Sequence, residues 1–226
     1  MKNVWWIPLL ALICACNRPE SDTAPRSGGV VAAPAAPVAS ADNRPAIVCF
    51  GDSLTAGFGV DPGKSYPDIL QQELNRRGYR YRVVNLGVSG DTTQDGLARL
   101  PLVVSEKPRI VVLEFGANDG LRGQPVSITE SNLSQMVEGL QKAGARVLLA
   151  GITLPPNYGP EYIPKFNAIY KELAGHYQLP LIPFLLAGVA GDGKLMQADG
   201  LHPNEEGTRL VAAGVMRALE PLLQKQ

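Results

Sequence analysis

Histidine and cysteine are both scarce in this chain of 226 residues, which contains two histidines and three cysteines. A mechanism that needs an imidazole must therefore use His176 or His202. The sequence has neither a CxxC pair nor an HExxH segment, so no metal site is predicted, and no organic cofactor either. So few cysteines also exclude a disulfide framework, even in an exported protein.

The chain lacks an excess of charge of either sign, because 21 Lys and Arg balance 21 Asp and Glu. Nucleic-acid binding usually requires a basic excess, so no nucleic-acid partner is predicted. Aromatic residues make up only 6% of the chain, but hydrophobic residues make up 45%. That length and composition predict one domain with one core, and we expect a monomer.

A single apolar run at the amino terminus, from Val4 to Ala15, is too short to cross a bilayer as a helix. It follows one positive charge, as in a secretory signal. The run ends in Cys-Ala-Cys, which resembles a bacterial lipobox with Cys16 as the lipidated residue. We therefore expect residues 1–16 to be a lipoprotein signal peptide. Asn17, which is not aspartate, favours the outer membrane facing the periplasm, and a soluble periplasmic or secreted form is the alternative.

Residues 17–45 are dominated by Pro, Ala, Ser and Gly and contain few large apolar side chains. Such a segment buries too little surface to offset the entropy of ordering, so we expect a disordered tether. Residues 46–226 then form the folded domain.

Short apolar runs alternate with helical patterns throughout that domain. Most of the runs are continuous rather than alternating, as in strands that are buried on both faces. The alternation predicts a three-layer α/β/α sandwich around a five-stranded parallel sheet. The expected strands are residues 46–50, 81–86, 109–115, 146–152 and 180–182. The expected apolar helix faces are Tyr66, Ile69, Leu70 and Leu74; Leu133, Met136, Val137 and Leu140; and Leu210, Val211, Val215 and Leu219.

Three polar segments follow expected strands, where ligands bind in parallel sheets. Gly-Asp-Ser-Leu ends in a serine, Ser53, that either begins a helix or acts as a nucleophile. Ser-Gly-Asp-Thr contains Gly90, whose backbone N–H a ligand could approach because glycine has no Cβ. An ordinary loop from strand to helix, with Asp91 or Thr92 as the N-cap, is the alternative. Gly-Ala-Asn-Asp-Gly contains Asn118, whose amide could face an oxyanion, although this composition is also typical of a turn.

A fourth segment, Asp-Gly-Leu-His-Pro, places Asp199 three residues before His202. That spacing allows the carboxylate to reach the ring, fix its tautomer and stabilise the imidazolium. A buried structural histidine is the alternative. The other histidine, His176, stands at an expected helix end and is not predicted to be the base. The joint occurrence of the four segments favours Ser53, His202 and Asp199 as a catalytic triad.

These four segments together resemble the SGNH (GDSL) hydrolases, and within them the bacterial thioesterase I/lysophospholipase-like arylesterases. Shared stretches include Gly96-Leu97-Ala98-Arg99-Leu100, the run from Asn118 to Gly123, and the run from Leu154 to Gly159. The resemblance implies the family's flavodoxin-like fold. It also implies an oxyanion hole made by the backbone N–H groups of Ser53 and Gly90 and the side-chain amide of Asn118.

The resemblance implies a serine esterase that forms an acyl-enzyme on Ser53. The expected substrates are short-to-medium acyl or aryl esters, and then thioesters and lysophospholipids. Four residues near the site are expected to line an acyl groove, namely Leu121, Leu154, Pro156 and Tyr158. A carbohydrate O-acetylesterase is the alternative enzyme, and a non-catalytic binding lipoprotein is the alternative outside enzymes.

Overall fold

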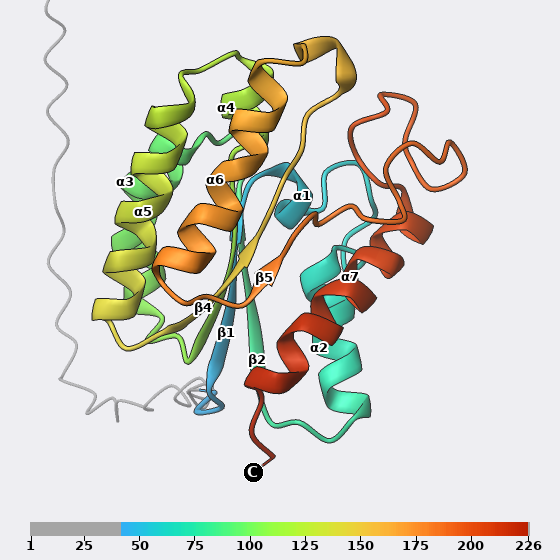
Figure 1. Ribbon diagram of the computed structural model, residues 1–226. Helices are drawn as coiled ribbons and strands as arrows, with labels where there is room; N and C mark the ends of the chain where they lie inside the picture. Colours follow the sequence, from blue (N-terminus) through green and yellow to red (C-terminus); the bar gives the residue numbers. More distant parts are fainter. Residues whose placement is uncertain (1–41, 226) are drawn as a thin grey trace, which may run out of the picture. The chain divides into compact units, whose positions relative to one another are not determined.

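Five parallel strands form one sheet in the computed structural model, which describes residues 42–225 (Figure 1). The strand order is β2-β1-β3-β4-β5, so the chain crosses over between β2 and β3. The sheet confirms the predicted strands, with ends that differ by one or two residues. The strands are β1 (Ala46–Gly51), β2 (Arg82–Gly87), β3 (Ile110–Glu114), β4 (Arg146–Ala150) and β5 (Leu181–Ile182).

Helices cover both faces of the sheet, which confirms the predicted three layers (Figure 1). On one face α2 packs against α7, and on the other α5 lies between α3 and α6. The long helices are α2 (Tyr66–Arg76), α3 (Thr93–Ser105), α5 (Val126–Lys142), α6 (Tyr162–His176) and α7 (Glu205–Leu219). Short elements are α1 (Ser53–Ala56), α4 (Ala117–Leu121), η1 (Pro156–Tyr158) and η2 (Glu220–Leu222).

Burial of the central strands explains their continuous apolar sequences. Every residue of β1 and β3 is buried, because helices cover both of their faces. The edge strand β2 is only partly buried and carries Arg82 and Asn85 among its apolar residues. The predicted apolar face of the last helix, α7, is wrong at one position. Leu210 is 47% exposed, whereas its neighbour Val211 points into the core.

The strand register brings the ends of three strands to one edge of the sheet. Gly51, the last residue of β1, pairs with Gly87 of β2 and with Glu114 of β3. The segments that follow these strands therefore begin side by side, as expected at the carboxyl edge of a parallel sheet.

Hydrogen bonds from side chains fix the starts of two helices next to this edge. Thr92 and Asp95 form a capping box at α3, directly after the Gly90 loop. Asn204 caps α7 by accepting from the backbone N–H groups of Glu206 and Gly207, directly after the His202 segment. Both loops therefore enter their helices along a fixed path.

The predicted signal peptide, Cys16 and most of the expected tether lie outside the described residues. Within residues 42–225, no helix has the length and apolar character needed to span a membrane.

Candidate active site

Ser53, His202 and Asp199 form a continuous chain of hydrogen bonds. The Nε2 atom of His202 lies 2.9 Å from Ser53 Oγ. Its Nδ1 atom lies 2.6 Å from Asp199 Oδ2. A carboxylate on Nδ1 fixes the proton there and leaves Nε2 free to accept the serine proton. The structure therefore brings the three residues together in the order that serine nucleophile chemistry needs.

The loop before α7 builds the Asp199–His202 pair. The second oxygen of Asp199 accepts from the backbone N–H groups of Leu201 and His202, at 2.9 and 3.0 Å. Burial raises the pKa of Asp199, but these hydrogen bonds and the one to the His202 ring outweigh it, so the pKa lies below its usual value. The His202 ring also packs on Phe58, with 4.6 Å between ring centroids.

Ser53 is the first residue of α1, so the Gly-Asp-Ser segment begins a helix, which was one of its two interpretations. Asp52 is the N-cap and accepts from the Leu54 N–H at 3.0 Å. The predicted helix start is therefore present, and it points the Ser53 hydroxyl towards His202.

Two buried carboxyl groups, those of Asp52 and Glu114, lie at this turn. Glu114 Oε2 accepts from the Asp52 backbone N–H at 3.2 Å and from the Thr55 hydroxyl at 2.8 Å. Glu114 Oε1 is buried and has no hydrogen-bond partner among the described residues. Burial raises the pKa of Glu114 well above its usual value, and the charge of Asp52 adds to the rise. Burial also raises the pKa of Asp52, to about 6. Burial therefore favours the protonated form of Glu114.

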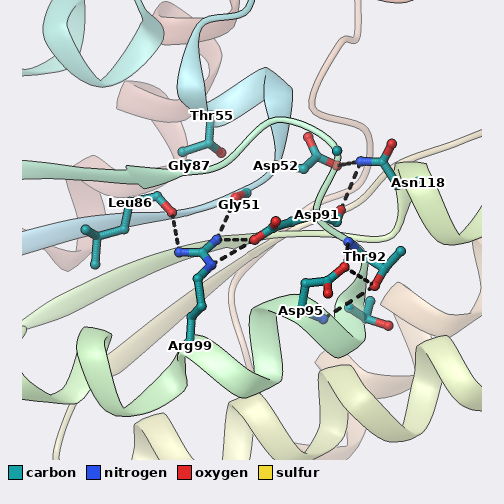
Figure 2. A network of polar contacts seen from close by, with 12 residues as sticks. Gly51, Asp52, Thr55, Leu86, Gly87, Asp91, Thr92, Asp95, Arg99 and Asn118 are labelled. Carbon is teal, nitrogen blue, oxygen red and sulfur yellow. Dashed lines mark hydrogen bonds and ion pairs between the residues drawn. The ribbon is translucent and has the colours of Figure 1, made fainter. Parts of the chain in front are cut away.

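Asn118 lies in α4, where a loop was one expectation. Gly116 makes the tight connection from β3, with φ of +119°, and a Cβ there would meet the Tyr170 hydroxyl. The Asn118 amide nitrogen donates to the Asp91 carbonyl at 2.9 Å and makes a longer contact of 3.4 Å with Asp52 Oδ2 (Figure 2). The amide therefore joins the loops that follow β1 and β2.

Gly90 stands at the turn between β2 and α3, with φ of +89°. A Cβ at this position would meet no atom within 4 Å, so the space in front of the glycine is open. The N–H groups of Ser53 and Gly90 donate to no other backbone group in residues 42–225. Both remain free for a ligand.

A cavity of about 560 Å³ opens at Ser53, Gly90, Asn118 and His202. Three of the four predicted groove residues line it, namely Leu121, Leu154 and Pro156. Tyr158 does not line it. Its hydroxyl donates instead to the Leu121 carbonyl at 2.9 Å, so it supports the wall from behind.

The other part of the cavity wall was not predicted from the sequence. The segment after β5 contributes Phe184, Leu186, Ala190 and Met196. This segment has no regular secondary structure, so it lacks the periodicity that marks a buried face. Glu114 was also missed, although a lone acid at the end of an apolar strand was a usable signal.

His176 lies away from these residues, as the last residue of α6. Its side chain is exposed, and its ring contacts that of Tyr177. His202 is therefore the only histidine of the chain that reaches Ser53.

Residues 49–210 match the model of the GDSL-like lipase/acylhydrolase family, and this span holds Ser53, Asn118, Asp199 and His202. The chain belongs to this family. It is a carboxylic ester hydrolase with the fold of the SGNH hydrolases, as the four segments predicted.

Relatives of the hydrolase share most of its length. Esterase TesA of Pseudomonas aeruginosa is 46% identical over 178 residues, which are 78% of this chain and 89% of the relative. An arylesterase of Vibrio mimicus is 42% identical over 174 residues, which are 76% of this chain and 87% of the relative. Thioesterase 1/protease 1/lysophospholipase L1 of Escherichia coli K12 is 39% identical and covers 78% and 84%. A crystal structure of TesA superposes with a TM-score of 0.76 at 45% identity, over 79% of this chain and 99% of that one.

Proposed function

We propose that Ser53, His202 and Asp199 hydrolyse esters through an acyl-enzyme. Ser53 Oγ attacks the ester carbonyl, and His202 Nε2 takes its proton as the C–O bond forms. His202 then returns the proton to the leaving alcohol or thiol as the tetrahedral intermediate collapses. Water then gives a proton to the same imidazole and attacks the acyl carbonyl, the bond from the acyl carbon to Ser53 Oγ breaks, and His202 returns the proton to Ser53 as the acid leaves. The observation that carries this proposal is the 2.9 Å contact between His202 and Ser53 at the mouth of an apolar cavity.

The oxyanion of the tetrahedral intermediate binds between the N–H groups of Ser53 and Gly90 and the amide of Asn118. One amide hydrogen of Asn118 stays on the Asp91 carbonyl, and the other turns from its long 3.4 Å contact with Asp52 to the oxyanion. Within residues 42–225 the two backbone N–H groups have no competing backbone acceptor. Donors of this kind are preorganised for the transition state, and loss of one costs about 10²–10³ in kcat.

The cavity supports acyl chains of short to medium length as substrates. Leucine, isoleucine, methionine and phenylalanine provide nine of the 21 residues that line the cavity at Ser53. Such a wall binds an alkyl or aryl group by burial of apolar surface. The names of the relatives support aryl esters first, and thioesters and lysophospholipids next.

A series of p-nitrophenyl esters and acyl-CoA thioesters of increasing chain length tests this proposal. We expect kcat/KM to rise from acetyl to medium chains and then to level off when the cavity is full. A carbohydrate O-acetylesterase would show no gain beyond acetyl. Absence of all hydrolysis by the folded protein would instead indicate the non-catalytic binding lipoprotein.

Two tryptophan variants locate the chain in the cavity. Ala190 lines the cavity, whereas the exposed Ala187 in the same segment does not. We expect Ala190→Trp to raise KM for the medium-chain ester and leave the acetyl ester unaffected. Ala187→Trp, the matched control, should change neither. Equal behaviour of the two variants would place the acyl chain elsewhere.

The amino-terminal sequence supports a lipid anchor on Cys16 that holds the protein at the outer membrane, facing the periplasm. We expect the anchored protein to be a monomer. Residues 17–45 would then separate the domain from the bilayer. An enzyme held at a membrane surface meets lipid-like substrates at high local concentration, which suits an apolar cavity.

A further inference from the structure

The proposed oxyanion hole takes its three donors from three separate loops. Ser53 follows β1, Gly90 follows β2, and Asn118 follows β3. Electrostatic stabilisation of an oxyanion depends on donors that are already in position before the reaction. Some contact must therefore hold the three loops in register with one another.

Arg99 of α3 reaches the ends of two of these strands. Its guanidinium donates to the Leu86 carbonyl in β2 at 3.1 Å and to the Gly51 carbonyl at the end of β1 at 3.5 Å (Figure 2). It also lies over the Phe50 ring, 5.0 Å from the centroid. Gly51 stands two residues before Ser53, so this side chain contacts the strand end that carries the nucleophile.

The same guanidinium binds the loop after β2 through Asp91. Arg99 Nε donates to Asp91 Oδ2 at 2.8 Å, and Nη2 lies 2.6 Å from the same oxygen. The backbone carbonyl of Asp91 accepts from the Asn118 amide, and its peptide nitrogen is bonded to Gly90. Figure 2 shows this chain of contacts from Arg99 through Asp91 to Asn118.

The chemistry of these contacts requires arginine. Only a planar guanidinium offers several donors at once in fixed directions, and lysine offers a single point charge. The side chains of Arg99 and Asp91 are 23% and 14% exposed, so solvent screens the pair weakly. An exposed ion pair between a helix and a loop would not also require hydrogen bonds to strand carbonyls or a contact with the Phe50 ring.

We propose that Arg99 is the positioning residue of the oxyanion hole, and that it acts through Asp91 to set the Gly90 loop and the Asn118 amide. This role rests on the proposed function of Ser53 and Asn118. Arg99 itself touches no substrate atom. Its loss should weaken transition-state stabilisation while substrate binding stays unchanged.

Two variants and a matched control test the role. Arg99→Lys keeps the positive charge but removes the planar guanidinium and its several donors. Arg99→Met combined with Asp91→Asn removes both charges, so that no carboxylate is left unpaired. Arg82→Met is the control. Arg82 is 24% exposed and pairs with Glu106, so it joins the other end of β2 to the other end of α3.

Three measurements on each folded variant separate positioning from stability. They are the melting temperature, kcat and KM on a p-nitrophenyl ester, and inhibition by an alkyl trifluoromethyl ketone. Ser53 Oγ adds to the ketone carbon, its proton passes to His202, and the carbonyl oxygen becomes an alkoxide in the oxyanion hole. The inhibition constant therefore reports on the hole without a leaving group.

We expect kcat to fall about tenfold in Arg99→Lys and about 10²-fold in the double variant, with KM almost unchanged. The inhibition constant should rise by the same factors. Arg82→Met should lower the melting temperature but leave kcat and the affinity for the ketone unchanged.

Three results would overturn the role of Arg99. They are an undiminished kcat in a folded double variant, an equal loss in Arg82→Met, and a fall in kcat with no change in ketone affinity. A wild-type enzyme that hydrolyses no ester contradicts the proposed function instead, so the two failures are distinguishable.

Discussion

The Nε2 atom of His202 lies 2.9 Å from the hydroxyl oxygen of Ser53, although 149 positions separate the two residues in the chain. Ser53 follows the inner strand β1, and His202 lies in the loop before α7. The contact therefore depends on the packing of α7 against α2, which brings the end of the domain back to its beginning. The proposed nucleophile and base meet only in the folded protein.

Ser53→Ala should abolish turnover. The variant removes the attacking oxygen, so we expect a fall in kcat of about 10⁴-fold or more and no labelling by a fluorophosphonate probe. Circular dichroism should show an unchanged fold, because the side chain is small and only partly buried. His176→Ala is the control, since His176 is the other histidine, and it should retain near wild-type activity. Normal labelling of Ser53→Ala would rule out this nucleophile.

Asp199→Asn should lower kcat by about 10⁴-fold while the fold and KM stay close to wild type. An amide in place of the carboxylate can donate to Nδ1, which favours the tautomer that has its proton on Nε2. That tautomer cannot accept the Ser53 proton. Steady-state kinetics on a p-nitrophenyl ester measures the effect, and a loss below about tenfold would mean that Asp199 does not orient His202.

Glu114→Gln should make stability less dependent on pH. The native pKa of Glu114 is raised, so the unfolded chain ionises first, at the ordinary value of 4.5. The stabilisation from the native proton is therefore complete below pH 4.5 and is lost as the pH rises towards the native pKa. A glutamine cannot ionise, and the variant should lack this decline. The raised pKa of Asp52 also makes stability fall as the pH rises, between pH 3.8 and about pH 6. Asp52 is unchanged in the variant, so its contribution is the same in both proteins.

Urea unfolding between pH 5 and pH 8 measures the effect on the free energy of unfolding. We expect the wild-type curve to fall more steeply than the variant's by up to about 1.4 kcal/mol per pH unit. Glu172→Gln is the control, because Glu172 is exposed on α6. Parallel curves for wild type and Glu114→Gln would show that Glu114 is ionised in the native protein.

Cys16→Ala should prevent lipidation. Expression with a radiolabelled fatty acid should label the wild-type protein and leave the variant unlabelled and displaced from the membrane fraction. Cys14→Ala is the matched control, because Cys14 lies two positions before the predicted lipid site, and it should still take up label. Label that persists in Cys16→Ala would point to another attachment residue or to a soluble form.

The sequence by itself determined the sheet, its parallel direction and the short motifs that are proposed to carry the chemistry. Continuous apolar runs such as residues 46–50 can be buried only between two layers, so the layering follows from composition and period. The polar segments at the strand ends then had to share one edge of the sheet. Ser53, Asn118 and His202 could be predicted because each stands in a short motif with local meaning.

Only the tertiary structure decided how those residues are supported. The raised pKa of Glu114 follows from complete burial and from the nearby Asp52 carboxyl, neither of which is visible in a linear motif. In the sequence, Arg99 and Asp91 are ordinary polar residues of a helix and a loop. Only the fold brings two strand carbonyls within hydrogen-bond distance of the Arg99 guanidinium. The cavity wall after β5 and the supporting position of Tyr158 depend on irregular loops. Such loops are placed by packing and by pairs of residues distant in sequence, whereas strands and helices carry their own periodicity.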